Sequence, residues 1–331
     1  MKSKTFIIAE AGVNHNGSIV LARKLIDAAK KSGADAVKFQ AYITDEICIK
    51  ESKMTKYQKK TKFKTQYALL KKYELERKQI IDLYNYARKK KIIFLLSFFD
   101  LRSLDLLKDI NLKFIKIPSG EITNYLLMKK VAKLNKKIIM STGMSNYKEI
   151  NFAINYLKKN GLNKKKISIL YCVSSYPTLT DEICLPEISN LIKKFKLTVG
   201  ISDHSLGIEA ALGSIFYGGT IIEKHLTLNR KLIGPDHAAS TEPKMFSSMV
   251  KSIRKIEKMI NKNKINNQKI NKFYVRKSIV ASKHIKKGDI FQESNITIKR
   301  PQLGLKSENI LKILGKKSKY NFSINDLIKV K

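Results

Sequence analysis

Short apolar runs recur along the first two thirds of the chain and alternate with longer amphipathic segments. The segment Ile19 to Lys31, for example, places Leu21, Leu25, Ala28 and Ala29 at helical spacing. Eight apolar runs occur before residue 226, at 6–9, 36–39, 92–96, 114–117, 138–140, 167–170, 198–201 and 220–222. Strands that are apolar along their whole length are buried on both faces, as in parallel sheets covered by helices. Eight such strands, each followed by a helix-like stretch, predict a closed (β/α)8 TIM barrel, since an open doubly wound sheet usually has fewer.

Polar residues of catalytic type lie at or just after the carboxyl end of each predicted strand. In a barrel of parallel strands all carboxyl ends meet at one rim, where active sites are built. We therefore expect the chemistry at this rim, from Glu10, Lys38, Gln40, Ser97, Lys116, Ser119, Glu121, Ser141, Ser174, Tyr176, Ser202, His204 and His225. An alternative for Glu121 is a carboxylate favoured by a helix dipole, and an alternative for Ser141 is a helix cap.

Two of these residues are histidines at consecutive strand ends. His204 follows the run that ends at residue 201, and His225 follows the run that ends at residue 222. If the two strands are neighbours, both imidazoles emerge at the same end of the sheet and supply half of a metal site. The alternative is a pair of hydrogen-bonded structural histidines. For His15 and His237, the sequence is equally consistent with support of a loop and with contact in the site.

The composition changes after residue 258. Residues 259–272 are rich in Asn and Lys and lack aromatic side chains, which is typical of a linker or of the exposed end of a helix. Residues 273–331 contain two β-like runs, a Lys-Lys-Gly-Asp turn and a third short run. The sequence thus predicts a barrel domain over 1–258, a linker over 259–272 and a small β-rich domain over 273–331, which is marginally stable alone.

The chain is strongly basic, with 66 Lys and Arg against 27 Asp and Glu and a formal net charge of +39. Taken alone, this charge favours a non-catalytic protein that binds a polyanion. However, only eight of the basic residues are Arg, and the Lys are spread over every helix-like segment. A protein that reads bases would cluster Arg. We interpret the charge as a solvated surface and expect no nucleic acid partner.

Cysteine usage and the N-terminus bear on the compartment. Cys48, Cys172 and Cys184 have no spacing typical of a disulfide framework or a zinc site. The N-terminus enters a strand-like run at once, and no apolar stretch reaches membrane-spanning length. These features predict a reduced, cytoplasmic protein with no membrane partner.

Eight motifs occur in the order found in one known family. They read IIAEAGVNHNGS, ADAVKFQ, KIPSGEITN, MSTGMS, SYPT, GISDHS, IIEKHLTL and GPDHAAS. Together they resemble the N-acetylneuraminate (sialic acid) synthase family, and the tail, RKSIVASKHIKKGDIF followed by NITIKRP, is similar to its C-terminal antifreeze-like (SAF) domain. The resemblance implies a transferase that condenses phosphoenolpyruvate with an N-acetylated mannosamine, releases phosphate and forms a nine-carbon 2-keto acid.

The same resemblance implies roles for individual residues. His204 and His225 match the family's ligands for Mn²⁺ or Mg²⁺, and Glu121 matches the carboxylate that positions or deprotonates the attacking water. The substrate contacts that it implies are Lys38, Lys116, Ser119, Ser141 and Ser202 for phosphoenolpyruvate, Gln40 and Ser97 at the same rim, and Glu10, Gln66, Tyr176 and Asp236 for the sugar. Arg300 matches an arginine that one subunit inserts into the barrel of the other, which implies a domain-swapped homodimer.

The sugar substrate is left open between two compounds. N-acetylmannosamine, which yields N-acetylneuraminate, is our first expectation, and the alternative is 2,4-diacetamido-2,4,6-trideoxymannose, which yields legionaminic acid. The motifs IPSGE and GPDH resemble these two branches more than the pseudaminate branch. A further hypothesis is a metal-dependent aldolase that uses pyruvate. LLSFFD, CVSSYPTL and KRPQLG depart from the family pattern, but none of them removes a metal ligand or Glu121.

Overall fold

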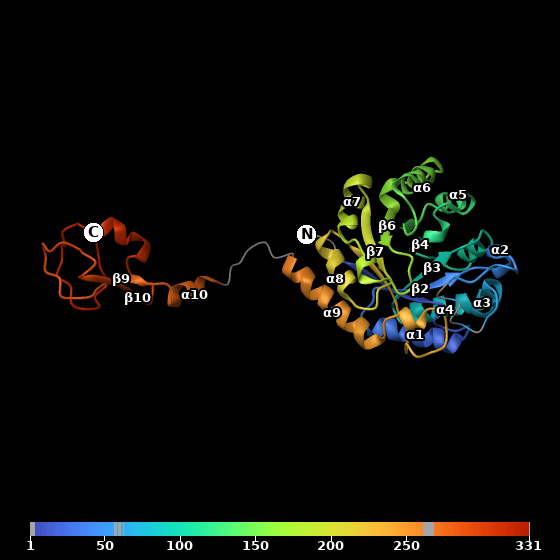
Figure 1. The fold of residues 1–331 in the computed structure, drawn as a ribbon, viewed down its shortest axis with the longest axis horizontal. Helices are drawn as coiled ribbons and strands as arrows, with labels where there is room; N and C mark the ends of the chain where they lie inside the picture. Colours follow the sequence, from blue (N-terminus) through green and yellow to red (C-terminus); the bar gives the residue numbers. More distant parts are fainter. Residues whose placement is uncertain (1–3, 56–57, 59–60, 62, 261–267, 331) are drawn as a thin grey trace. The chain divides into compact units, whose positions relative to one another are not determined.

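The computed structural model describes residues 4–55, 58, 61, 63–260 and 268–330, which form two compact units, Met1–Asn261 and Lys262–Lys331. The first, here called the barrel unit, is a closed barrel of parallel strands in the order β1 to β8, with β8 paired to β1 (Figure 1). The strands are β1 (Phe6–Gly12), β2 (Ala36–Ala41), β3 (Ile93–Phe98), β4 (Phe114–Ile117), β5 (Lys137–Ser141), β6 (Ile167–Cys172), β7 (Thr198–Asp203) and β8 (Ile221–His225). The predicted (β/α)8 barrel is confirmed.

Helices surround the barrel, and most of them return the chain to the start of the next strand. They are α1 (Ile19–Lys31), α4 (Arg77–Lys89), α5 (Tyr125–Lys133), α6 (Tyr147–Lys159), α7 (Pro186–Phe195), α8 (Glu209–Phe216) and α9 (Pro243–Ile260), with α2 (Thr44–Ile47) and α3 (Gln66–Tyr73) inserted before α4. Several of these helices begin at a residue whose side chain caps the N-terminus. The side chain of Asn146, for example, caps α6 by accepting from the backbone N–H groups of Lys148 and Glu149.

The connection from β3 to β4 departs from the predicted pattern of a full helix after every strand. It carries a 3₁₀ helix, η2 (Ser103–Lys108), instead of an α-helix. Asp100 starts this turn by accepting from the backbone N–H of Ser103 at 2.7 Å. Ser103 and Leu106 are both buried, and residues three apart share one face of a 3₁₀ helix.

The interior of the barrel changes character along its axis. Alternate residues of a strand point to the same face, so inward positions recur every second residue. The amino-terminal part is filled by an apolar layer of Ile8, Ala36, Leu95, Ile139, Leu170 and Ile221, against which Phe6, Ile93 and Phe114 pack. Two residues further along, the corresponding positions are mostly polar: Glu10, Lys38, Ser97, Lys116, Ser141, Cys172 and Glu223. An apolar layer therefore lies beneath a polar cavity.

The second unit, here called the C-terminal unit, is built around a short antiparallel pair. It begins with α10 (Gln268–Val275), and β9 (Ser278–Ala281) pairs with β10 (Ile296–Lys299). Short helical turns η7 (Ser307–Asn309) and α11 (Ile310–Ile313) follow. Its core contains Ile279, Ala281, Ile285, Phe291, Ile296, Ile313, Phe322 and Ile328. Of the predicted linker, 259–272, the ends belong to α9 and α10, and residues 261–267 lie outside the described residues.

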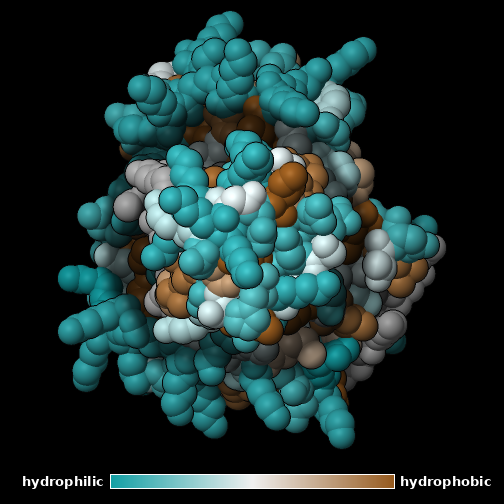
Figure 2. All heavy atoms as spheres, turned by 90° about the vertical axis from the view of Figure 1, so that its left-hand side faces the viewer, coloured by the Kyte–Doolittle hydropathy of each residue, from teal (hydrophilic) through white to brown (hydrophobic). Residues whose placement is uncertain are grey.

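The surface reflects the high lysine content. Hydrophilic side chains cover most of the face drawn in Figure 2, with hydrophobic side chains between them in scattered groups. None of the helices in the described ranges is both long and apolar enough to cross a bilayer.

Candidate active site

A cavity of about 340 Å³ lies at the carboxyl end of the barrel strands. Of the site residues predicted in the barrel unit, those that line it are Glu10, Lys38, Gln40, Gln66, Ser97, Lys116, Ser119, Glu121, Ser141, Tyr176, Ser202, His204 and His225. The sequence reasoning missed further lining residues, namely Ile47, Gln58, Leu70, Phe99, Pro118, Gly120, Cys172 and Glu223. A larger hollow of about 840 Å³ lies beside the starts of α8 and α9, but its charged side chains are mostly exposed. The smaller cavity is therefore the candidate active site.

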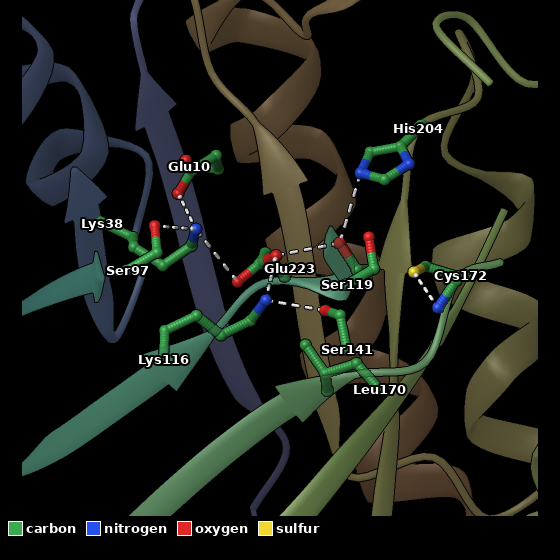
Figure 3. Close-up of polar contacts among 12 residues, drawn as sticks. Glu10, Lys38, Ser97, Lys116, Ser119, Ser141, Leu170, Cys172, His204 and Glu223 are labelled. Atoms are coloured by element: carbon green, nitrogen blue, oxygen red, sulfur yellow. Dashed lines mark hydrogen bonds and ion pairs between the residues drawn. The ribbon is translucent and has the colours of Figure 1, made fainter. Parts of the chain in front are cut away.

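Two lysines and two carboxylates form an ionic cluster on the floor of the cavity (Figure 3). The Nζ atom of Lys38 lies 2.7 Å from Oε2 of Glu10 and 3.7 Å from Oε2 of Glu223. The Nζ atom of Lys116 lies 3.5 Å from Oε1 of Glu223. All four side chains are at most 5% exposed. Glu223, which projects from β8, thus joins lysines from β2 and β4 across the barrel.

Burial and the neighbouring charges perturb the cluster's pKa values in different directions. Burial alone would raise the pKa of Glu223, but Lys116 and Lys38 lower it to about 2. Burial raises the pKa of Glu10 to about 7 against the opposing effect of Lys38. Burial also lowers the pKa of Lys116, whereas Glu10 and Glu223 keep the pKa of Lys38 above its usual range despite its burial. Because Glu223 stays ionised, it balances part of the lysines' positive charge.

Three hydroxyl groups complete the floor of the cavity. Lys116 donates to Oγ of Ser141 at 2.7 Å, and Lys38 donates to Oγ of Ser97 at 3.3 Å. Ser202 donates to Oε1 of Glu223 at 2.9 Å. Buried ammonium and hydroxyl groups that converge on one cavity are suited to a ligand carrying phosphate and carboxylate groups.

The two predicted metal ligands lie side by side at the rim, with ring centroids 5.6 Å apart. Nδ1 of His204 lies 2.8 Å from the carbonyl oxygen of Val173, so this nitrogen carries the proton and Nε2 keeps a lone pair. Nδ1 of His225 is buried and has no hydrogen-bond partner within the described chain. Burial lowers the pKa of both imidazoles, which keeps them neutral. Among the described residues, no group of three or more His, Cys, Asp and Glu side chains is arranged to hold a metal ion.

Tyr176 and Asp236 border the histidines from different loops. The ring of Tyr176 packs 4.2 Å from that of His204 and 5.9 Å from that of His225, centroid to centroid. Oδ2 of Asp236 lies 3.8 Å from Nδ1 of His225, although Asp236 is not part of the cavity lining. A methyl group added to Gly12, whose φ is +50°, would lie 3.3 Å from carboxylate oxygens of both Asp236 and Glu10. Glycine at this position keeps the space between the two carboxylates open.

The capping alternative for Ser141 is wrong, whereas Glu121 does lie just before the N-terminus of α5, as its helix-dipole alternative expects. Asn124 caps α5 by accepting from the backbone N–H of Leu127, and it donates to Oε2 of Glu121 at 2.7 Å. Glu121 itself lines the cavity, and burial raises its pKa. Ser141 ends β5 and accepts from Lys116, as described above. Both side chains are therefore directed to the cavity and do not cap a helix.

His15 and His237 support loops and do not line the cavity. Nδ1 of His15 accepts from the backbone N–H of Gly17 at 3.0 Å. His237 contacts the hydroxyl of Thr227 at 2.7 Å and the side-chain oxygen of Asn16 at 3.1 Å. His237 thus ties the loop after β1 to the loop after β8.

Arg300 belongs to the C-terminal unit and not to the barrel. It is exposed and follows β10 directly, before Pro301. Its predicted insertion into a second barrel remains a prediction.

Comparison with known proteins identifies the family. The sequence profile of the NeuB family matches residues 25–265, and that of the SAF domain matches residues 276–329. The chain is 45% identical to N,N'-diacetyllegionaminic acid synthase of Campylobacter jejuni, over 98% of this chain and 99% of that protein. It is 37% identical to N,N'-diacetyllegionaminic acid synthase of Legionella pneumophila, over 96% of this chain and 91% of that protein.

A solved structure agrees with these matches. N-acetylneuraminic acid (sialic acid) synthetase from Leptospira borgpetersenii is similar to this structure with a TM-score of 0.72 and 35% sequence identity, over 82% of this chain and 90% of that chain. Since the NeuB profile spans most of the chain and the SAF profile spans its tail, the chain belongs to the NeuB family and carries a C-terminal SAF domain.

Proposed function

We propose that the protein is a phosphoenolpyruvate-dependent synthase of a nine-carbon 2-keto sugar acid, and that the product is N,N'-diacetyllegionaminic acid. The sugar substrate is then 2,4-diacetamido-2,4,6-trideoxymannose. Two relatives that bear this name, at 45% and 37% identity over nearly the whole chain, favour it over N-acetylmannosamine, which was the first expectation from sequence. The three cysteines are free thiols, in keeping with the predicted cytoplasmic location.

The ionic cluster is the observation that carries the proposed chemistry. Phosphoenolpyruvate has a phosphate and a carboxylate, and Lys38 and Lys116 offer two buried cations in one cavity. Ser97 and Ser141 accept hydrogen bonds from these ammonium groups and so hold them in the cavity. In a buried site such charge-assisted hydrogen bonds are stronger than neutral ones.

The histidines fit a divalent metal ion, Mn²⁺ or Mg²⁺. Both imidazoles are neutral, His204 keeps a lone pair on Nε2, and Nδ1 of His225 lacks a partner in the described residues. A metal held by His204 and His225 would act as a Lewis acid toward the aldehyde oxygen of the sugar. Two protein ligands leave the remaining positions to solvent and substrate.

The remaining residues bind the sugar and manage protons. We assign Glu10, Gln66, Tyr176 and Asp236 to the sugar side. In the proposed reaction, C3 of phosphoenolpyruvate forms a bond to the aldehyde carbon, and the aldehyde oxygen takes up a proton. Water then adds to C2 and gives one proton to Glu121. The C2–O bond to phosphate breaks, the leaving phosphate takes the electron pair and the proton of the new C2 hydroxyl, and the 2-keto group forms. A carboxylate suits this step because it accepts a proton and stabilises positive charge at C2.

We also propose that the active unit is a domain-swapped homodimer in which Arg300 of one copy reaches the sugar bound in the other. The proposal depends on the family resemblance of the KRP motif and on the exposure of Arg300. An exposed cation on a small appended domain is free to meet an acceptor group on a second barrel.

The deciding experiment is phosphate release from phosphoenolpyruvate by chelator-treated protein, with each sugar and with Mn²⁺ added back. We expect release only with both metal and 2,4-diacetamido-2,4,6-trideoxymannose, and little with N-acetylmannosamine. Faster turnover of N-acetylmannosamine would make the protein a neuraminate synthase. Reaction of pyruvate in place of phosphoenolpyruvate would indicate the aldolase hypothesis. No reaction with any of these substrates, together with tight polyanion binding at physiological salt, would refute the enzyme proposal.

A further inference from the structure

A fully buried ion pair lies on the outer wall of the barrel, directly behind the two histidines. Nζ of Lys224 contacts Oδ2 of Asp203 at 2.7 Å, and the side chains are 2% and 1% exposed. Asp203 on β7 and Lys224 on β8 are register partners. Because side chains alternate along a strand, this pair faces away from the cavity, whereas their neighbours His204 and His225 line it.

The pair holds the backbone on both sides of His204. Oδ1 of Asp203 accepts from the backbone N–H of Ser205 at 2.9 Å and from its hydroxyl at 2.6 Å. Nζ of Lys224 donates to the carbonyl oxygen of Ser205 at 2.8 Å. The residues before and after His204 are therefore tied to the residue that precedes His225.

This arrangement is poorly explained by stability alone. Two charges removed from water repay their desolvation only with good geometry, and apolar residues of similar volume are often as stable. Here every carboxylate oxygen and two of the three ammonium protons have partners, and all of these partners lie beside the histidines. The network therefore orders the strand ends that carry the imidazoles.

We propose that Asp203 and Lys224 form a positioning pair that sets the separation and orientation of His204 and His225 for a divalent metal ion. The inference rests on the metal site of the proposed function. It goes beyond that site because Asp203 and Lys224 touch neither the cavity nor the metal. Residues of this kind, one step behind the ligands, tune metal affinity through the ligands that they orient.

The test uses Asp203→Asn combined with Lys224→Met, which removes both charges together and leaves neither unpaired. Mn²⁺ affinity is measured by electron paramagnetic resonance of the free ion, and phosphoenolpyruvate affinity by calorimetry. We expect the Kd for Mn²⁺ to rise about 10–100-fold. The Kd for phosphoenolpyruvate should not change, because Lys38 and Lys116 are untouched.

Two further variants separate positioning from folding. Ser205→Ala removes only the hydroxyl bond to Asp203 from a half-buried residue, so it should fold and weaken Mn²⁺ binding about five-fold. Leu170→Ala destabilises the apolar layer beneath the cavity without touching the pair, so its Kd for Mn²⁺ should match the wild type although its Tm falls.

Wild-type Mn²⁺ affinity in a folded double variant, or in Ser205→Ala if the double variant does not fold, would overturn the inference. So would an equal loss of affinity in Leu170→Ala. Absence of Mn²⁺ binding by the wild type would also overturn it. The proposed synthase activity is judged separately, by sugar-dependent phosphate release from the wild type with Mg²⁺.

Discussion

Replacing Glu223 by Gln tests the ionic cluster directly. Gln keeps the size of the side chain and an oxygen that can accept from Ser202, but it removes the negative charge that lies 3.5 Å from Lys116 and 3.7 Å from Lys38. Lys38 retains Glu10 at 2.7 Å. Lys116 loses the carboxylate that the structure places beside it, so the cost of the substitution falls mainly on Lys116.

The size of the effect follows from the burial of the cluster. A carboxyl whose pKa falls from 4.5 to about 2 is favoured in its ionised form by about 3 kcal/mol. Removing one partner of a buried ion pair costs about 3–5 kcal/mol, and the remaining Glu10 places Glu223→Gln at the lower end. Because the pKa of Glu223 is lowered on folding, its ionised form stabilises the folded protein fully above pH 4.5 and loses this effect as the pH falls towards 2. The stabilisation is therefore fully present at pH 7. At about 2–4 °C for each kcal/mol, Tm should fall by about 6–12 °C.

Thermal unfolding without phosphoenolpyruvate measures the loss of stability, and unfolding with phosphoenolpyruvate measures how far the ligand restores it. The anionic ligand supplies the missing negative charge, so it should raise the Tm of Glu223→Gln more than that of the wild type. The matched control is Glu46→Gln, which breaks an exposed pair with Arg102 at 2.8 Å and should leave Tm close to that of the wild type. The role of Glu223 would be refuted if the Tm of Glu223→Gln equalled that of the wild type, or if phosphoenolpyruvate raised both Tm values equally.

Three other substitutions address the remaining parts of the site. Burial raises the pKa of Glu121, so the acid limb of the plot of kcat against pH should lie above the ordinary pKa of Glu. Glu121→Gln should lower kcat about 10²–10⁴-fold and abolish that limb. An acid limb that persists in the variant would exclude Glu121 as the base. Arg300→Ala should raise KM for the sugar far more than KM for phosphoenolpyruvate, and equal effects would count against the swapped arm. Gly12→Ala should cost about 1–2 kcal/mol of backbone strain and also lower turnover, because the methyl group meets Asp236 and Glu10. In Gly161→Ala, where φ is +98° and the added methyl meets no atom within 4 Å, strain alone is expected; equal turnover in the two variants would show that the space at Gly12 is not used.

Sequence patterns located most of the cavity lining because they mark strand ends. Polar residues at the end of an apolar run, such as Lys116, or shortly after it, such as Ser119 and His204, are recognisable without any contact information. Glu223 directly follows the predicted run 220–222, but it was passed over in favour of His225 two positions later; β8 contains both residues. The period of two along β8 was the available signal, since it puts Glu223 on the same face as His225.

Other features had no local signal. The sequence around His15 and His237 does not distinguish a loop support from a site contact. The role of His237 as a loop support depends on a contact between segments more than two hundred residues apart, with Asn16. The β3–β4 connection contains enough apolar residues for a helix, but their spacing suits a 3₁₀ turn against the barrel. Such outcomes are decided by packing rather than by propensity.

The sequence by itself determined the architecture and the rim at which the polar residues gather. Eight apolar runs separated by helix-length segments have few ways to bury both faces of every strand, and parallel strands bring all their carboxyl ends to one side. The tertiary structure alone decided how charges are shared across the barrel. Glu223 on β8 meets Lys38 on β2 and Lys116 on β4 because the closed barrel brings these strands around one cavity floor. Distances between strands far apart in sequence set the burial and the pKa values, and no single stretch of sequence records them.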